Sequence, residues 1–193
     1  MLIIGTYRPC ALITVISTKP ADEASKPGEG QIMTDAIPMI ERRRIEAELL
    51  KEVYETLVSR FGVDEARRVI AESVRRSSIT QAKNFAEQAD GGTSLDSFIA
   101  IQSNWTAENA LEITVIHRDS IHYDFNVTRC RYAEMYKEMG LADIGGLLSC
   151  NRDGSFCDGY DPRLKLLRTQ TIMNGAEYCD FRYRYEDDCE NGS

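Results

Sequence analysis

The sequence has few of the features that mark membrane, secreted or nucleic-acid-binding proteins. Its longest apolar run, residues 11–16, is far shorter than the roughly 20 residues needed to cross a bilayer, and only Arg8 precedes it as a positive charge. No run of Lys and Arg exceeds Arg42, Arg43 and Arg44, and the formal net charge is -8. We therefore expect a cytoplasmic protein with no membrane partner and no nucleic-acid partner, because the latter needs a basic face.

Cysteine is present, but without the dense and regular spacing of a small disulfide-bonded secreted domain. The six positions are Cys10, Cys130, Cys150, Cys157, Cys179 and Cys189. No Cys-x-x-Cys or His-x-x-x-His pair occurs, so standard zinc spacing is missing, although three cysteines and an acid could still meet in the fold. We expect reduced thiols, and we assign neither a metal nor a cofactor.

The chain of 193 residues, 42% of them hydrophobic, is long enough for one core of ordinary size. Residues 17–31 mix Pro and Gly with small and charged residues and have neither helical nor strand periodicity, which indicates a linker. Met33 is followed at once by a helical pattern, and the glycine and glutamate codons just upstream are purine-rich, as a ribosome-binding site is. We expect residues 1–32 to be a disordered or untranslated leader, residues 33–185 a single domain, and residues 186–193 a flexible tail.

Hydrophobic periodicity predicts a long first helix. In residues 40–61 the apolar residues recur at steps of three and four with charges between them, which indicates an amphipathic helix. Gly62 is the expected stop. The predicted apolar face comprises Ile45, Leu49, Leu50, Val53, Leu57 and Val58.

Two more helical segments are expected before the middle of the chain. Asp64 can cap a second helix, which is predicted to break at residues 77–78 and to continue as a short polar stretch. Thr93 and Asp96 resemble a capping box, so a third helix is expected up to about residue 109. These segments are predicted to be scaffold.

From residue 111 the hydrophobic period changes from 3.6 to 2. Alternating residues in 111–116 and 121–128 predict a β-hairpin. Helices are then expected over 130–139 and 141–148. Residues 151–162 are rich in Asn, Asp and Gly, which indicates a loop.

A second hairpin is expected near the C-terminus. Residues 164–173 and 178–185 read as strands around the turn signal Asn174-Gly175. The fold class is therefore α+β: N-terminal helices followed by an antiparallel sheet of about four strands, in two hairpins with intervening helices.

Several blocks of the C-terminal half together resemble the L-2-amino-thiazoline-4-carboxylate hydrolase family. They are residues 126–134, Gly140, Cys150, Asp153, residues 168–171 and residues 175–182. The resemblance implies a hydrolase that opens a cyclic isothiourea and converts the thiazoline carboxylate into N-carbamoyl-L-cysteine on the route to cysteine. More distantly, the same region is similar to vinyl-reductase-type sensor domains, which hold zinc through a Glu and three cysteines. Arg168 and Thr171 stand where two of those ligands would be.

Ring opening needs a water, a base for its proton and an acid for the departing atom. Cys150 and Asp153 flank the expected helix end and are candidates for nucleophile and base, although a loop Asp more often makes a turn. Cys130 and Glu134 are four apart on one helix, so they share a face and are further catalytic candidates. The alternative for this pair is a buried small hydrophobe beside a surface acid.

The substrate carboxylate needs a cation, and Arg168 is the best candidate because its planar fork can bind a carboxylate bidentately. An ordinary surface salt bridge is the alternative. Thr171, Tyr132 and Asn126 lie in the resembling blocks and are further substrate-binding candidates, while Tyr132 could equally pack in the core. Cys179 is the weaker catalytic candidate, because a core thiol fits its strand position.

Two functions remain open at this point. The first is a ring-opening hydrolase of a small-molecule substrate, without a metal. The second is a non-catalytic small-molecule-binding domain of the sensor type, with or without a structural zinc. Either is compatible with a homo-oligomer.

Overall fold

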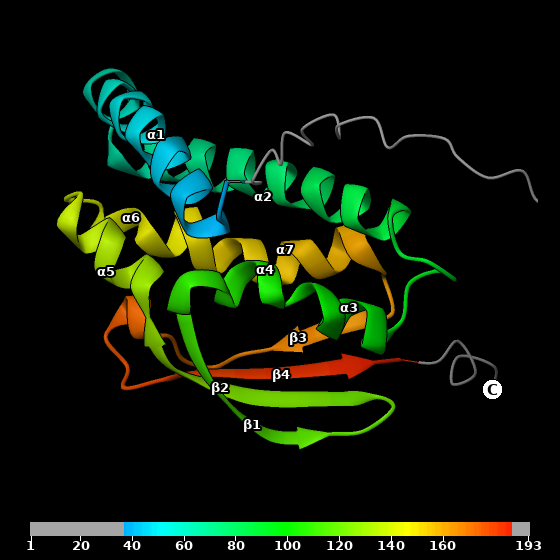
Figure 1. The fold of residues 1–193 in the computed structure, drawn as a ribbon. Helices are drawn as coiled ribbons and strands as arrows, with labels where there is room; N and C mark the ends of the chain where they lie inside the picture. Colours follow the sequence, from blue (N-terminus) through cyan, green and yellow to red (C-terminus); the bar gives the residue numbers. More distant parts are fainter. Residues whose placement is uncertain (1–36, 187–193) are drawn as a thin grey trace, which may run out of the picture. The chain divides into compact units, whose positions relative to one another are not determined.

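A four-stranded antiparallel sheet forms one layer of the structure, and the helices gather on one of its faces (Figure 1). The computed structural model describes residues 37–186, so the expected leader and all of the expected tail except Glu186 lie outside it. Strands β1 (Leu111–Arg118) and β2 (His122–Cys130) form the predicted first hairpin. Strand β4 (Cys179–Tyr185) lies between β2 and β3 (Leu164–Leu167), giving the order β1-β2-β4-β3. The predicted α+β class is confirmed.

Helices occupy most of the remaining described chain. They are α1 (Met39–Phe61), α2 (Val63–Glu87), α3 (Leu95–Ile101), α4 (Ser103–Thr106), α5 (Arg131–Glu138), α6 (Ala142–Gly145) and α7 (Asn151–Tyr160), with 3₁₀ turns at Ala107–Asn109 and Ile172–Asn174. Gly62, at a φ of 83°, turns the chain directly from α1 into α2, a conformation that favours glycine. Asp64 therefore lies inside α2 and does not cap it. Within residues 37–186, no helix has both the length and the apolar character needed to cross a membrane.

The buried face of α1 differs from the predicted one. Ile45, Leu49 and Val53 are exposed. The residues that α1 buries are Met39, Ile40, Arg43 and Ala47. The periodicity was misleading because one position of the true face is a charged residue. Arg43 is buried, with one terminal nitrogen of its guanidinium hydrogen-bonded to Glu46 and the other to Gln81.

Helix α2 runs without the predicted break at residues 77–78, because small side chains there let α7 approach closely. The Ser78 hydroxyl is buried and donates to the carbonyl of Arg152 at 2.9 Å. On the facing helix, a Cβ added at Gly159 would lie 2.5 Å from the carbonyl oxygen of Ile79 and 2.9 Å from the Cβ of Ala82. Tertiary packing therefore keeps the serine pair helical.

The predicted loop over residues 151–162 is helix α7, which continues α6 through a π-helical turn at Gly146–Cys150. Its Asn, Asp and Gly content indicated a loop, but the buried positions recur at helical spacing. They are Arg152, Ser155, Phe156, Cys157 and Tyr160. Packing on α2 and on the sheet outweighs the low helix propensity of its other residues.

The capping box and the end of the third predicted helix are also corrected. Ser94 and Ser97 form the box: the Ser97 amide donates to the Ser94 hydroxyl at 3.1 Å, and the Ser94 amide donates to the Ser97 hydroxyl at 2.8 Å. The predicted helix to residue 109 is broken into α3, α4 and a 3₁₀ turn. Glu108 and Asn109 both adopt a φ of 56°, which ends helical pairing before β1.

The second hairpin is shorter than predicted and lacks the tight Asn174-Gly175 turn. Strand β3 ends at Leu167 because the Asp180 carboxylate accepts the backbone N–H groups of Thr169 and Gln170, at 3.0 and 2.8 Å. Those amides are thereby taken out of the ladder with β4. Asn174 and Gly175 instead close a 3₁₀ turn, with Gly175 at a φ of 93°.

Asp161, just after α7, joins three segments of the chain. Its buried carboxylate accepts hydrogen bonds from the Thr93 hydroxyl at 2.6 Å and the Tyr185 hydroxyl at 2.5 Å, and it pairs with Arg163 at 2.8 Å. Burial by itself would raise the pKa of Asp161, but the bonds from Arg163, Thr93 and Tyr185 outweigh it and hold the pKa well below the usual range. The ionised form therefore stabilises the fold.

We expect Asp161→Asn to lower the free energy of unfolding by about 1–3 kcal/mol at pH 7, because charged hydrogen bonds are lost. The contribution is present above the unfolded pKa near 3.8 and is lost as the pH falls through the lower folded pKa, so the difference from wild type narrows in acid. Urea unfolding at pH 7 and pH 3 measures both. Asp158→Asn, at an exposed position of α7, is the control and is expected to change stability little.

Candidate functional site

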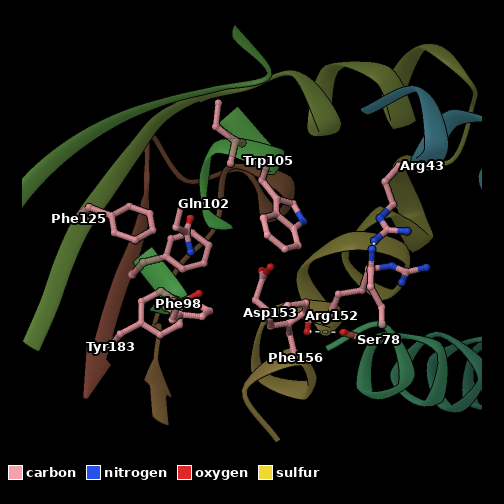
Figure 2. A pocket seen from close by; sticks show the side chains of 13 residues that line it. Arg43, Ser78, Phe98, Gln102, Trp105, Phe125, Arg152, Asp153, Phe156 and Tyr183 are labelled. Carbon is pink, nitrogen blue, oxygen red and sulfur yellow. Dashed lines mark hydrogen bonds between the residues drawn. The ribbon is translucent and has the colours of Figure 1, made fainter. Parts of the chain in front are cut away.

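Two adjoining chambers, of about 60 Å³ each, lie between the inner face of the sheet and the helices. The two chambers share six lining residues, which makes them parts of one cavity: Arg43, Trp105, Leu111, Arg152, Asp153 and Phe181. The first chamber is largely aromatic, with Phe98, Trp105, Phe125, Phe156, Phe181 and Tyr183 in its wall (Figure 2). A cavity of this size suits a single small ring, since ordinary drug-sized sites start at roughly 300 Å³.

The second chamber brings together most of the residues that the sequence singled out. Its wall includes Cys130, Tyr132, Cys150, Asp153, Arg168 and Cys179. Cys130 ends β2, Cys150 ends the π-helical turn and Cys179 begins β4, so three separate elements supply the thiols. The three cysteines are far apart in the sequence, so their grouping was not predicted. They come together because β2 pairs with β4 and α7 packs against the sheet.

Asp153 is the acid of the cavity. Its side chain points from α7 towards Trp105 (Figure 2), and its carboxylate pairs with Arg168. The second amino group of Arg168 donates to the carbonyl of Cys150 at 2.9 Å, and its guanidinium carbon lies 4.9 Å from the ring centroid of Phe181. Burial raises the pKa of Asp153 above its usual value, while Arg168 opposes that rise. A carboxylate with these properties can exchange a proton with a bound ligand.

The thiols of the cavity are held in the protonated form. Burial raises the pKa of Cys150 to about 12 and that of Cys130 to about 11, and it also raises the pKa of Cys179. All three are free cysteines. Because the thiolate is the reactive species, these sulfurs are poor nucleophiles at neutral pH in the ligand-free protein. Their raised pKa values favour Asp153 over them for proton transfer.

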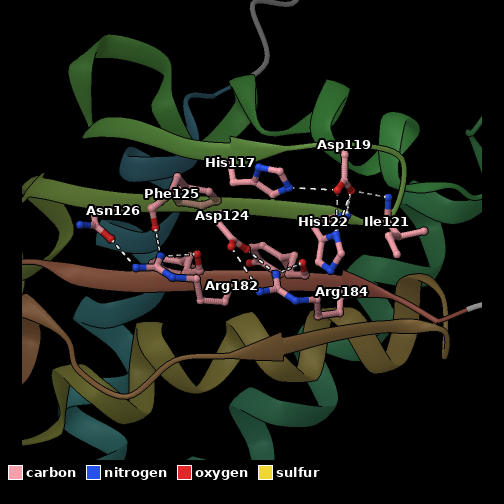
Figure 3. A network of polar contacts seen from close by, with 11 residues as sticks. His117, Asp119, Ile121, His122, Asp124, Phe125, Asn126, Arg182 and Arg184 are labelled. Atoms are coloured by element: carbon pink, nitrogen blue, oxygen red, sulfur yellow. Dashed lines mark hydrogen bonds and ion pairs between the residues drawn. The ribbon is translucent and has the colours of Figure 1, made fainter.

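Two predicted site residues lie away from the cavity. Glu134 is on the exposed side of α5, where Arg129 donates to it at 2.9 Å. Asn126 points to the outer face of the sheet and accepts a hydrogen bond from Arg182 at 3.0 Å (Figure 3). Its strand neighbours Phe125 and Val127 line the chambers, and successive side chains of a strand point to opposite faces.

The remaining predicted binding residues have mainly structural contacts. The Tyr132 hydroxyl, in the wall of the second chamber, donates to the carbonyl of Trp105 at 3.3 Å. Thr171 is buried and caps the 3₁₀ turn by accepting the amide of Asn174 at 3.2 Å. It also lines a surface groove of about 570 Å³ together with Cys150 and Arg168. Since Cys150 and Arg168 line both spaces, they separate the chamber from the groove.

Comparison with known proteins gives a family. The model of the L-2-amino-thiazoline-4-carboxylic acid hydrolase family matches residues 42–183. The chain belongs to this family. The suspected resemblance is thereby confirmed, and the match extends over the helical region as well as over the blocks near the C-terminus.

The other comparisons include remote structural similarities. No curated protein matches this chain. A solved structure of the phenol-responsive sensory domain of the transcription activator PoxR with phenol is 14% identical, with a TM-score of 0.47 over 74% of each chain. A trafficking protein particle complex subunit 3 from Naegleria fowleri, covalently bound to palmitic acid, is 11% identical, with a TM-score of 0.44 over 75% of this chain and 97% of that one.

Several residues that line the cavity were not predicted from the sequence. Trp105 fell in the third predicted helix, which was expected to be scaffold, yet it lines both chambers. Arg43 and Arg152 also line both chambers, although they fell in a predicted helix and a predicted loop as ordinary charged residues. The one signal in the sequence was the position of Arg152 directly before Asp153, a residue that carries the family resemblance.

A separate polar cluster lies at the β1-β2 turn (Figure 3). The Asp119 carboxylate lies 2.9 Å from ring nitrogens of both His117 and His122, and it accepts the backbone N–H of Ile121 at 2.9 Å. The three side chains offer ligand atoms within 4.8 Å of one another and could hold a divalent cation. The cavity cysteines and Asp153 do not form such a group within residues 37–186.

Proposed function

We propose that the protein is a hydrolase that opens the ring of L-2-amino-thiazoline-4-carboxylate to give N-carbamoyl-L-cysteine. The observation that carries this proposal is the Asp153–Arg168 pair in a small cavity with aromatic walls, in a chain that belongs to the hydrolase family. The small five-membered ring suits the aromatic walls, and its polar, amidine-like edge suits the acid. The free thiols of the described residues also support a cytoplasmic location, where reducing conditions keep cysteines unpaired.

The proposed reaction consumes one water. The water adds to the amidine-like ring carbon that lies between sulfur and nitrogen. Asp153 takes one proton from the water and passes it to the ring nitrogen, as the carbon–nitrogen double bond becomes a single bond. The carbon–sulfur bond then breaks, the proton of the added hydroxyl moves through Asp153 to the departing sulfur, and the carbon becomes the carbonyl of the carbamoyl group. Arg168 holds the Asp153 carboxylate in place, and the cavity walls exclude competing water.

The test is to incubate purified protein with L-2-amino-thiazoline-4-carboxylate under argon and to follow the mass and thiol content of the product. A gain of one water together with one new thiol per molecule supports the proposal. Absence of turnover by folded protein contradicts it. If a ligand then binds without turnover, the second candidate function, a non-catalytic small-molecule-binding domain, is the better one. The aromatic lining of the cavity favours it.

We expect Cys150→Ser to retain activity within about tenfold of wild type, because a thiol with a pKa of about 12 is not the nucleophile in this mechanism. Steady-state rates of ring opening measure this. Cys157→Ser is the matched control, since Cys157 is a buried thiol of α7 that does not line either chamber. A loss of about a thousandfold at Cys150 alone would point to covalent catalysis by its sulfur.

A further inference from the structure

Two buried arginines converge on the cavity and share one carboxylate. Arg43 of α1 and Arg152 of α7 are only 4% and 8% exposed. Glu46 pairs with Arg43 at 2.6 Å and with Arg152 at 3.0 Å, and the two guanidinium groups lie next to each other (Figure 2). With two cations and one anion, this end of the cavity has an excess positive charge in a region of low polarity.

Arg152 also has an unused donor. Its Nε donates to the carbonyl of Leu148 at 3.0 Å and its Nη2 donates to Glu46, but its Nη1 is buried and has no partner among the described residues. An unpaired buried donor is costly, and more so on a charged group. Burial, together with the neighbouring Arg43, lowers the pKa of Arg152 to about 10, which reflects the same shortage of negative charge.

Arg168, which the sequence suggested as the carboxylate anchor, is already engaged. One of its amino groups pairs with Asp153 and the other donates to the carbonyl of Cys150. Its charge is balanced within the cavity, whereas that of the Arg43 and Arg152 pair is not.

We propose that Arg152, with Arg43 beside it, binds the carboxylate of a small single-ring ligand whose ring lies among the aromatic side chains of the cavity. Asp153 follows Arg152 on α7 and lines the same chambers, so the opposite, amidine-like edge of such a ligand can face an acid. The ligand class is a single-ring monocarboxylate. The inference rests on the proposed function for the identity of the natural ligand, and it assigns the anchor of that ligand to Arg152.

The test uses two compounds that cannot undergo the reaction, thiazole-4-carboxylate and thiazole. Trp105 is the single tryptophan of the chain and lines both chambers, so its fluorescence reports occupancy directly. Wild type is expected to bind the carboxylate more tightly than the parent ring. Arg152→Gln is expected to weaken binding of the carboxylate by about 10- to 100-fold and to leave thiazole binding unchanged, which removes the preference.

Two further variants keep the test decisive. Arg152→Lys retains a positive charge without the planar fork and is expected to lose part of the preference for the carboxylate. This variant provides the test if Arg152→Gln does not fold. Arg75→Gln, at an exposed arginine of α2, is the control and should keep the preference. The inference is overturned if wild type shows no preference for the carboxylate, or if the Arg152 variants weaken both compounds equally.

The outcomes also separate this inference from the proposed function. Loss of the carboxylate preference in Arg152→Gln, in a protein that does not hydrolyse L-2-amino-thiazoline-4-carboxylate, supports the anchor and contradicts the reaction. Hydrolysis by wild type with an unchanged KM in Arg152→Gln supports the reaction and contradicts the anchor.

Discussion

Asp153→Asn is expected to lower kcat/KM for ring opening by about 10²- to 10⁴-fold, the usual contribution of a general base. The amide is close in shape to the carboxylate and can still accept a hydrogen bond from Arg168, but it cannot take a proton from water. Because the loss is in the chemical step, kcat should fall while KM changes little.

The pH dependence gives the same residue a second test. Burial raises the pKa of Asp153, and a base must be ionised to act, so activity is expected above the folded pKa and is lost as the pH falls through it. The acid limb of the kcat/KM profile should therefore lie above pH 3.8, the usual value for an exposed Asp, and should vanish in Asp153→Asn.

The matched control is Asp158→Asn, which removes an exposed carboxylate from the same helix. It should retain wild-type rates and the wild-type pH profile. Circular dichroism and thermal melting establish that both variants are folded. If Asp153→Asn keeps full activity, Asp153 is not the base, and the mechanism proposed for the cavity fails.

Gly159→Ala is expected to destabilise the protein by about 1–3 kcal/mol, because the new methyl group has no room between α7 and α2. It would lie 2.5 Å from the carbonyl oxygen of Ile79, and a backbone atom cannot move aside as a flexible side chain can. The two helices would have to separate at the crossing that supports the cavity. Urea unfolding measures the change.

Gly154→Ala, five residues earlier on the same helix, should have the opposite sign. A Cβ at Gly154 meets nothing within 4 Å, so alanine is expected to raise the free energy of unfolding by about 0.5–1 kcal/mol through its better helix propensity. Equal effects at the two positions would mean that propensity, and not the close α2–α7 contact, decides the stability of this helix.

The first hairpin and the end of the first helix followed from the sequence because those patterns are local. The alternation over residues 111–128 predicted the first hairpin, and the glycine at residue 62 marked the end of α1. Buried faces were harder. Arg43 and Ser78 are polar but buried, because each forms a hydrogen bond with a residue far away in the sequence. A hydrophobicity pattern contains no information about such partners.

The site shows the same division. The family blocks led to Cys130, Tyr132, Cys150, Asp153 and Arg168, all of which line the second chamber. They also led to Glu134 and Asn126, which the helix surface and the pleat of β2 direct away from it. Residues that are neighbours in a motif can point to opposite sides of a helix or strand, and only one side faces the cavity.

The sequence by itself determined the α+β class, the four-strand sheet and the family, because these depend on local periodicity and on motifs spread along one chain. Tertiary structure alone decided that residues 151–160 form a helix, that Trp105 and the thiols share a cavity, and that Arg43 and Arg152 meet over Glu46. Those features depend on residues that are far apart in the sequence, such as Arg43 and Arg152, which are 109 positions apart. Neither helix propensity nor residue spacing predicts which distant residue a buried polar group will contact.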